Sequence, residues 1–219
     1  SPYLPATRRF FHPLYIRVEA IEEYAYLRGA ERAAVEALAA GQQAVDRDAR
    51  LLDRNSSYAA KLQALRQVYR VPRSPARVQQ FEAFVREAGP GLDSFALWCA
   101  LAAEYPPDAP EWQEGLHSAM TAAKSTELAG EILFYKWLQW ICDEQLESAQ
   151  RAALSAGMEI GIVHDLAVGV HPGGADAWTL RDVMAPEVSV GAPPDMFNQI
   201  GQDWSQPPWD PDRLAESGY

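Results

Sequence analysis

The chain has 219 residues, a formal net charge of −11, and a composition in which 48% of residues are hydrophobic and 22% are charged. These values are typical of a globular protein that can bury a core. The negative charge disfavours a nucleic-acid partner, because such a partner requires a basic surface to displace counterions, and Arg8-Arg9 is the only basic doublet. It does not count against a neutral ligand.

No apolar run approaches the roughly 18 residues of a membrane-spanning helix, so we expect no membrane partner. The first residues do not show the pattern of a signal peptide. Cys99 and Cys142 each lie within a helical pattern and are typical of small buried side chains in a reducing compartment, which predicts a cytoplasmic location and no disulfide. Ser1 begins a structured-looking segment without a methionine, and we therefore expect an excised piece of a longer protein.

The chain begins with a short apolar segment and continues with a long helical block. Leu14–Val18 follows Pro13 and is apolar and partly β-branched, which predicts a strand or an extended segment. From Glu19 to about Lys124 the pattern is helical and shows no chemistry of its own. Apolar residues at helical spacing predict helices over Glu31–Arg50, over Tyr58–Tyr69, from Pro75 to a stop at Gly89-Pro90-Gly91, and over Asp93–Tyr105.

The second half changes from helix to strand and then to loop. The strongly apolar helical pattern over Glu127–Ala156 predicts a long buried helix, which ends at Gly157 in a left-handed cap. Met158–Val163 is a compact apolar run, which predicts a strand inside a parallel sheet. Helix, glycine stop and buried strand form half of a βαβ unit, so the predicted class is α/β and helix-rich. Residues 164–219 are dominated by loop and contain seven of the sixteen prolines, and a loop tract that long is usually functional.

His164-Asp165 stands where the predicted strand ends. Sites are built at the carboxyl ends of parallel strands, and a carboxylate there can bind sugar hydroxyls or organise an arginine. The alternative, of equal weight, is that Asp165 caps the loop that follows. His164, His171, Asp165 and Asp176 fit no established metal-ligand spacing. Neither a P-loop nor a dinucleotide fingerprint is present, so we predict no metal and no cofactor.

Residues 190–209 form the most informative segment. Two Pro-Pro pairs stiffen it and two glycines supply hinges. Phe197 and Trp204 offer aromatic faces, and Gln202 offers an amide. An aromatic face covers the C–H side of a sugar ring while an amide or carboxylate binds its hydroxyls, so this combination suits an oligosaccharide groove. The alternative is that the aromatic residues pack the loop onto the rest of the domain, and for Trp209 we prefer it.

Three sets of residues, in order along the chain, resemble the motifs of amylomaltases, glycoside hydrolase family 77. Ser1-Pro2-Tyr3 followed by His12–Ile16 resembles the S-P-Y…N-P-x-Y-I opening of that family. Gly161–Val170 resembles its third-strand motif, and Gly174–Trp178 is similar to the S-A-E-x-W that follows. Val190–Phe197 and Gly201–Trp204 resemble its V-G-A-P-P-D and G-Q-x-W loop.

The resemblance implies a partial (β/α)8 TIM-barrel segment that carries a large helical insertion subdomain. Residues 1–20 would be a barrel segment with a glucan-contact loop, and residues 21–125 the insertion. Residues 126–219 would hold a barrel helix, the third strand and the active-site loop, with the chain truncated at both ends. The family transfers a 1,4-α-glucan segment from a donor to an acceptor by a retaining double displacement. The implied partners are maltooligosaccharides or 1,4-α-glucan.

The resemblance also implies a set of glucan contacts. Tyr3 resembles the aromatic residue that stacks on a glucose near the cleavage point, and Asp165 the carboxylate that supports the donor site. The implied substrate-binding residues are Tyr3, Asp165, Asp195, Phe197, Gln202 and Trp204, of which the last four lie on the loop that overhangs the active site. Two positions depart from the family pattern: His12 replaces an asparagine, and Met196 stands where some members have an aromatic residue.

No catalytic residue is implied within this chain. The family's nucleophile lies in an R-I-D-H-type motif and its acid/base glutamate lies further on, and neither motif occurs before Tyr219. We therefore expect a chain that is part of an enzyme but inactive alone. The alternatives are a non-catalytic carbohydrate-binding or protein-interaction module, and a metal hydrolase centred on His164 and Asp165. Strand edges left open in such a segment would be covered by the helical block or by self-association.

Overall fold

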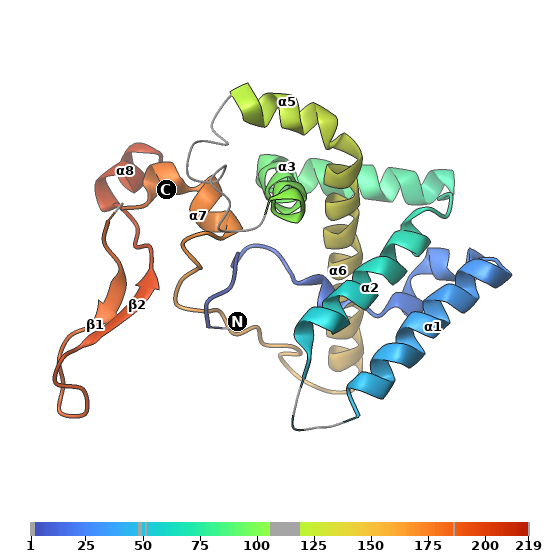
Figure 1. Cartoon of the computed structure of the whole chain (residues 1–219), viewed down its shortest axis with the longest axis horizontal. Coiled ribbons are helices and arrows are strands. Elements are labelled where there is room, and N and C mark those ends of the chain that lie inside the picture. The colour runs from blue at the N-terminus through green and yellow to red at the C-terminus, as the bar shows by residue number, and fades with distance from the viewer. Residues whose placement is uncertain (1–2, 48–49, 51, 106–118, 186, 219) are drawn as a thin grey trace. The chain divides into compact units, whose positions relative to one another are not determined.

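The computed structural model describes residues 3–47, 50, 52–105, 119–185 and 187–218 (Figure 1). The chain forms two compact units. Unit 1 comprises residues 1–10, 93–132 and 163–219, and unit 2 comprises residues 11–92 and 133–162. No helix among the described residues is long and apolar enough to cross a membrane. The part of the predicted helical block at residues 106–118 lies outside the described residues.

Unit 2 begins with 3₁₀ turns, so the predicted strand over Leu14–Val18 is wrong. The turns are η1 (Pro13–Tyr15), η2 (Val18–Ala20) and η3 (Glu22–Tyr26). Proline at the first position of η1 has the φ of a turn and no N–H to lose. The Nδ1 atom of His12 accepts a hydrogen bond from the Leu14 N–H at 3.2 Å, and this cap favours the turn over an extended chain.

His12 gives this turn a small pH dependence. Partial desolvation lowers the pKa of His12 from its ordinary value of 6.5, and Arg54 and Lys61 lower it further. The unfolded chain therefore binds the proton first, so this stabilisation is complete above pH 6.5 and is lost as the pH falls through the folded pKa. We expect His12→Asn, which keeps a capping side chain, to flatten the pH dependence. Urea unfolding of both forms between about pH 5 and 8 measures it, and parallel curves would contradict it.

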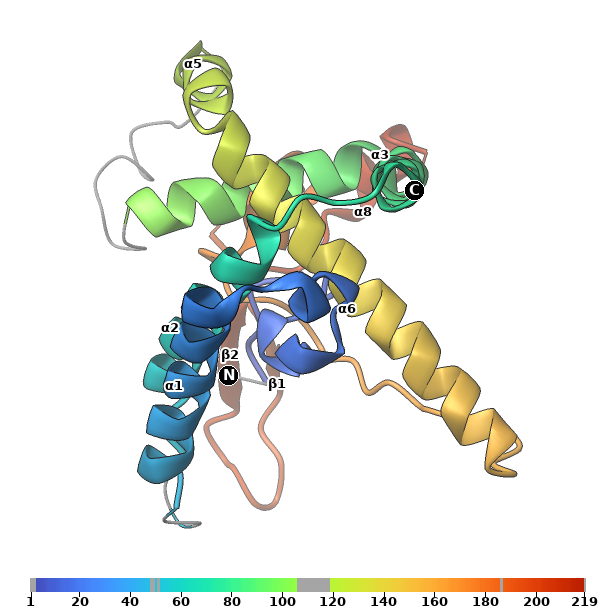
Figure 2. The same ribbon diagram turned by 90° about the vertical axis from the view of Figure 1, so that its right-hand side faces the viewer.

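The predicted helices of the block are confirmed, with changed ends. They are α1 (Gly29–Val45), α2 (Arg54–Tyr69) and α3 (Pro75–Glu104). The carboxylate of Asp53 begins α2, because its Oδ1 atom accepts hydrogen bonds from the N–H groups of Asn55 and Ser56. Inside α3 the predicted stop is present: Gly89 has φ 64° and ψ −159°, which interrupts the helix before Pro90. The helices α1 and α2 lie side by side in both views (Figures 1 and 2).

The core of unit 2 forms on α6 (Ala129–Ser155). All of its residues from Phe134 to Cys142 except Lys136 are buried, which confirms the predicted burial on several sides. Phe134 and Trp137 each lie 5.2 Å, between ring centroids, from Tyr69 at the end of α2. Trp140 lies 5.5 Å from Phe81 of α3. Aromatic contacts of this kind add to the hydrophobic burial that joins α2, α3 and α6.

An ion cluster with a buried centre joins η3, α3 and α6. The guanidinium of Arg77, in α3, donates from Nε to Glu23 at 3.1 Å and from Nη2 to Glu144 at 3.0 Å. Its central carbon lies 4.0 Å from the ring centroid of Trp140. Burial alone would lower the pKa of Arg77, but the hydrogen bonds to Glu144 and Glu23 raise it above its ordinary value, so the guanidinium stays charged. Both Arg77 and Glu23 are buried, which makes each depend on the other.

The end of α6 is as predicted, but the strand after it is not. Gly157 has φ 91°, and the N–H groups of Gly157 and Met158 donate to the carbonyls of Leu154 and Ala153, which is a Schellman cap. Residues 158–163 form no strand. The side chain of Gln150 instead bonds the carbonyl of Ile160 and the N–H of Ile162. A strand needs a neighbour, and the strands among the described residues pair only with each other.

Unit 1 contains most of the chain that was predicted as loop. Its elements after residue 163 are α7 (Ala175–Thr179), η4 (Arg181–Val183), β1 (Val190–Ala192), β2 (Gln202–Gln206) and α8 (Pro211–Glu216), and α5 (Ala119–Glu127) precedes α6. The antiparallel hairpin β1–β2 is a feature that the sequence did not predict (Figure 1). The helix-rich character is confirmed, whereas no parallel strand pair is found among the described residues.

Candidate functional site

The hairpin is bent where β2 leaves β1. Val190 pairs with Gln206 and Gly191 with Asp203, so Trp204 and Ser205 form a bulge between the two pairs. Ser205 has φ 56°, a left-handed conformation that costs a residue with a side chain about 1–2 kcal/mol. The Oδ1 atom of Asp203 accepts hydrogen bonds from the Ser205 N–H at 2.7 Å and from the Ser189 hydroxyl, and these bonds stabilise the bend. The same hydrogen bonds lower the pKa of Asp203.

Close approach of the two strands requires glycine in β1. A Cβ atom at Gly191 would lie 2.0 Å from the carbonyl oxygen of Gln202, well inside contact distance. Gly201 begins β2 with φ 76°, which residues with side chains rarely adopt. These two glycines, predicted as hinges, therefore shape the hairpin.

The hairpin tip holds apolar side chains in solvent. Asp195 accepts hydrogen bonds at Oδ1 from the N–H groups of Phe197 at 2.8 Å and Asn198 at 2.7 Å, which closes the turn. The side chains beside it are almost fully exposed: Met196 at 82%, Phe197 at 91% and Ile200 at 93%. Large apolar groups that gather on a surface are typical of a binding site. Asp195 thus shapes the turn that presents them.

Gln202 and Trp204 are in contact, as residues of one surface should be. The indole Nε1 of Trp204 donates a hydrogen bond to the Gln202 Oε1 atom at 3.0 Å. Trp204 is 38% exposed, so its ring is held by a polar contact and stays accessible. Trp209, for which packing is the preferred reading, pairs by its backbone with Met184 of the unit 1 core.

The N-terminal segment of unit 1 is tied to this hairpin and to α7. The carbonyl of Tyr3 accepts a hydrogen bond from Gln206 Nε2 at 3.2 Å, while the Tyr3 residue is 83% exposed. The His171 N–H donates to the carbonyl of Pro5 at 2.8 Å, and the Asp176 N–H to that of Ala6 at 3.1 Å. The segment is therefore fixed by its backbone, and the tyrosine ring is left on the surface.

Asp176 is the centre of these contacts, a role that the sequence analysis missed. The residue is 4% exposed, and its carboxylate accepts hydrogen bonds from the Thr7 hydroxyl at 2.8 Å, the Arg8 N–H at 2.8 Å and Arg9 Nε at 3.0 Å. Arg8 in turn donates to the carbonyl of Val168 at 3.1 Å. The only signal in the sequence was an acidic residue in the first turn of a short helix and the Arg8-Arg9 doublet.

Asp165 lies in a part of unit 1 that has no regular secondary structure. It is exposed, and among the described residues no hydrogen bond or ion pair involves it. The alternative that it caps the following loop therefore finds no support. Arg8 fixes the segment just beyond it, through the carbonyls of Ala167 and Val168. In the described part of the chain no group of three or more His, Cys, Asp or Glu side chains could hold a metal ion.

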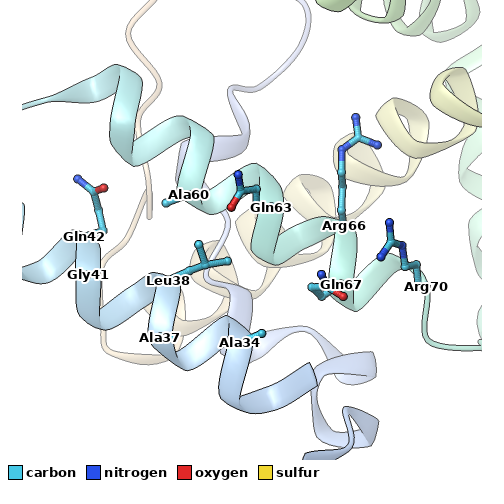
Figure 3. Close-up of a pocket in the computed structure, with 10 residues that line it drawn as sticks. All are labelled: Ala34, Ala37, Leu38, Gly41, Gln42, Ala60, Gln63, Arg66, Gln67 and Arg70. Atoms are coloured by element: carbon cyan, nitrogen blue, oxygen red, sulfur yellow. The ribbon is translucent and has the colours of Figure 1, made fainter. Parts of the chain in front are cut away.

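A separate groove lies in unit 2 between α1 and α2 (Figure 3). It is lined by small and apolar residues in its middle and by two arginines of α2. The residues are Ala34, Ala37, Leu38, Gly41, Gln42, Ala60, Gln63, Arg66, Gln67 and Arg70. None of the predicted glucan contacts is among them, and no carboxylate lines the groove, so it offers neither a nucleophile nor an acid.

Related proteins are similar in sequence to this chain over its full length. A family model described as 4-alpha-glucanotransferase matches residues 1–219. The chain is 52% identical over 222 residues to the 4-alpha-glucanotransferase of Mycobacterium tuberculosis (strain ATCC 25618 / H37Rv), a match that covers 100% of this chain and 30% of that protein. It is 29% identical over 238 residues to the 4-alpha-glucanotransferase of Haemophilus influenzae, and covers 34% of it.

Two solved structures resemble this one. The crystal structure of amylomaltase from Corynebacterium glutamicum matches with a TM-score of 0.86 and 50% identity, over 100% of this chain and 30% of that one. Amylomaltase from Streptococcus agalactiae, in complex with acarbose, matches with a TM-score of 0.72 over 99% of this chain and 44% of that one. Its identity is 17%, so it shows the fold alone.

The family that the sequence motifs indicated is confirmed by these matches. The chain spans 30% of the length of the mycobacterial relative and 34% of that of the Haemophilus relative. With a family model that covers all of its residues, this chain belongs to the 4-alpha-glucanotransferase family, glycoside hydrolase family 77.

Proposed function

We propose that the chain is part of a 4-alpha-glucanotransferase, which transfers 1,4-α-glucan segments to an acceptor by a retaining double displacement. Its own task is to hold the glucan. The observation that carries this proposal is the hairpin, where a turn closed by Asp195 keeps Phe197 91% exposed at the tip and β2 carries the Gln202–Trp204 pair. Large apolar side chains that gather on a protein surface are typical of a site that binds a ligand or a partner.

Each residue of the surface has a task that its chemistry suits. The rings of Phe197, Trp204 and Tyr3 stack on the C–H faces of glucose units. The amide of Gln202 and the carboxylate of Asp165 bind hydroxyl groups, since both are exposed polar side chains. The relatives support a glucan as the ligand, because the Streptococcus protein was solved with acarbose and the others are named as glucanotransferases.

The catalytic pair is assigned to no residue of this chain. A retaining mechanism requires two carboxyl groups about 5 Å apart, one as nucleophile and one as acid and base. We propose that they are supplied by other parts of the parent protein. The exposed apolar side chains of Ile160 and Val163, at 76% and 78%, suit burial against such parts.

A cytoplasmic location fits the two cysteines. Both Cys99 and Cys142 are free, and burial raises the pKa of the Cys142 thiol to about 12, so it is inert as a nucleophile. The division into a barrel segment, a helical insertion and an active-site loop region remains a prediction.

The test is the affinity of the 219-residue chain for maltoheptaose, measured by titration calorimetry. We expect Trp204→Ala to weaken binding roughly fivefold, because one stacked ring contributes about 1 kcal/mol. Trp209→Ala is the matched control, since Trp209 is 42% exposed but pairs with the unit 1 core, and we expect no change in affinity. Equal losses for both variants would contradict the assignment of Trp204.

A wild-type chain that binds no glucan would favour the second candidate, a protein-interaction module. The groove between α1 and α2 is the feature that would serve it (Figure 3). Incubation with maltotriose tests the missing catalytic pair: we expect no glucose to be released, and release would show that the chain carries its own nucleophile and acid.

A further inference from the structure

We propose that Gln206 is a positioning residue that couples the hairpin to Tyr3. It keeps a fixed distance between the two parts of the proposed glucan surface, which are the hairpin and the N-terminal segment that carries Tyr3. This proposal deepens the proposed function and rests on it for the role of the tyrosine ring. The contact itself lies within unit 1, between the last residue of β2 and the carbonyl of Tyr3.

The burial of Gln206 is exceptional for its strand. The preceding residues of β2 are all exposed, whereas Gln206 is 6% exposed. Its amide nitrogen donates to the Tyr3 carbonyl at 3.2 Å. A carbonyl only accepts, so the amide must present its nitrogen there, and its oxygen is turned the other way.

The groups around the Gln206 amide oxygen confine the amide. Among the described residues, the buried Oε1 atom of Gln206 has no hydrogen-bond partner. A Cβ atom at Gly169 would lie 2.6 Å from it, so the amide fills the space that a side chain at Gly169 would need. Buried polar atoms without a partner are rare in folded proteins. Here the amide is confined between Gly169 on one side and the Tyr3 carbonyl on the other.

The hairpin is shaped to deliver this side chain. The bulge at Trp204 and Ser205, with Ser205 in a left-handed conformation, separates the exposed part of β2 from Gln206. Asp203 stabilises that bend through its bond to the Ser205 N–H. Strained residues and bulges concentrate at functional sites, where they aim side chains. The strand that carries Trp204 therefore ends in the hydrogen bond from Gln206 to the Tyr3 carbonyl, which we call the clamp.

Gln206→Glu tests the clamp without any ligand. The substitution keeps the shape of the side chain but places a carboxylate oxygen, which cannot donate, against the Tyr3 carbonyl. We expect the N–H groups of His171 and Asp176, which bond the carbonyls of Pro5 and Ala6, to exchange with solvent about tenfold faster as the segment detaches. Gln202→Glu, the same change on the same strand, is expected to leave both rates unchanged. Unchanged rates in Gln206→Glu would overturn the proposal.

Gly169→Ala reaches the clamp from the other side. A methyl group there displaces the Gln206 amide, and Gly169 has no left-handed φ, so alanine does not strain the backbone. We expect the same faster exchange at His171 and Asp176, with the thermal transition retained. This variant decides the matter if Gln206→Glu fails to fold, and slow exchange in a folded Gly169→Ala chain would overturn the clamp.

A double-mutant cycle shows whether Gln206 acts through the tyrosine ring. Gln206→Glu is expected to weaken maltoheptaose binding about fivefold in the wild-type background and to have no further effect in a Tyr3→Ala chain. Equal losses in both backgrounds would mean a merely structural role and would overturn the positioning claim. If the wild-type chain binds no maltoheptaose while Gln206→Glu still speeds exchange, the proposed function fails and the clamp stands.

Discussion

Replacing Arg77 with methionine is expected to lower the free energy of unfolding by about 3–5 kcal/mol. Glu23 is 2% exposed and its carboxylate depends on Arg77, so the substitution would leave a buried charge without a partner. Glu144 loses the same partner, but its side chain is 36% exposed and water can replace the guanidinium. The penalty therefore falls mainly on Glu23.

Urea unfolding of the wild type and of Arg77→Met measures this loss, and two further variants identify its cause. Glu23→Gln in the Arg77→Met background removes the trapped charge and should recover much of the stability. Arg151→Ala is the control: Arg151 and Glu147 also form an ion pair, at 2.8 Å, but both side chains are more than 60% exposed. We expect that pair to contribute no more than about 0.5 kcal/mol. A loss at Arg77 as small as at Arg151 would contradict the prediction.

The helices could be predicted because their causes are local. Glu31–Arg50 and Glu127–Ala156 have helical periodicity over many residues, and Gly157 has the cap position that only glycine adopts readily. The start of α2 had a local cause too, since Asp53 caps it, whereas α1 ends at Val45 rather than at Arg50. The strand predicted over Leu14–Val18 failed because Pro13 and the His12 cap favour a turn, and the one over residues 158–163 failed because a strand depends on a neighbour elsewhere. Residues 158–163 are an apolar run, but an apolar run forms a β-strand only where another strand can hydrogen-bond to it.

The residues of the candidate site also differ in whether their role depends on nearby or on distant parts of the sequence. Phe197, Gln202 and Trp204 could be predicted as glucan contacts because they lie within one short motif, and the structure brings Gln202 and Trp204 into contact. Asp176 and Gln206 were missed because their partners are distant in sequence: Asp176 bonds Thr7 across 169 positions, and Gln206 bonds Tyr3 across 203. No periodicity or spacing encodes such a contact. The residues of the proposed glucan surface could therefore be picked out from the sequence, while the contacts that hold them in place could not.

That framework predicts the second large effect, at Asp176. Asp176→Asn is expected to cost about 3 kcal/mol, because hydrogen bonds to a charged group contribute about 1.5–3 kcal/mol each and Asp176 accepts from Thr7, Arg8 and Arg9. The amide of asparagine keeps the size of the carboxylate but turns an N–H toward donors that need an acceptor. The loss should appear in urea unfolding and as faster exchange of the Arg8 N–H.

Asp182→Asn controls for the general effect of removing one negative charge from unit 1. Asp182 lies in η4, its side chain is 96% exposed, and it reaches Arg181 only at 3.9 Å, so we expect no measurable change. If Asp176→Asn were equally silent, residues 5–9 would be held by their backbone contacts alone. A loss confined to Asp176 would instead show that one buried carboxylate fixes the segment from which Tyr3 projects, although Asp176 is not among the predicted glucan contacts.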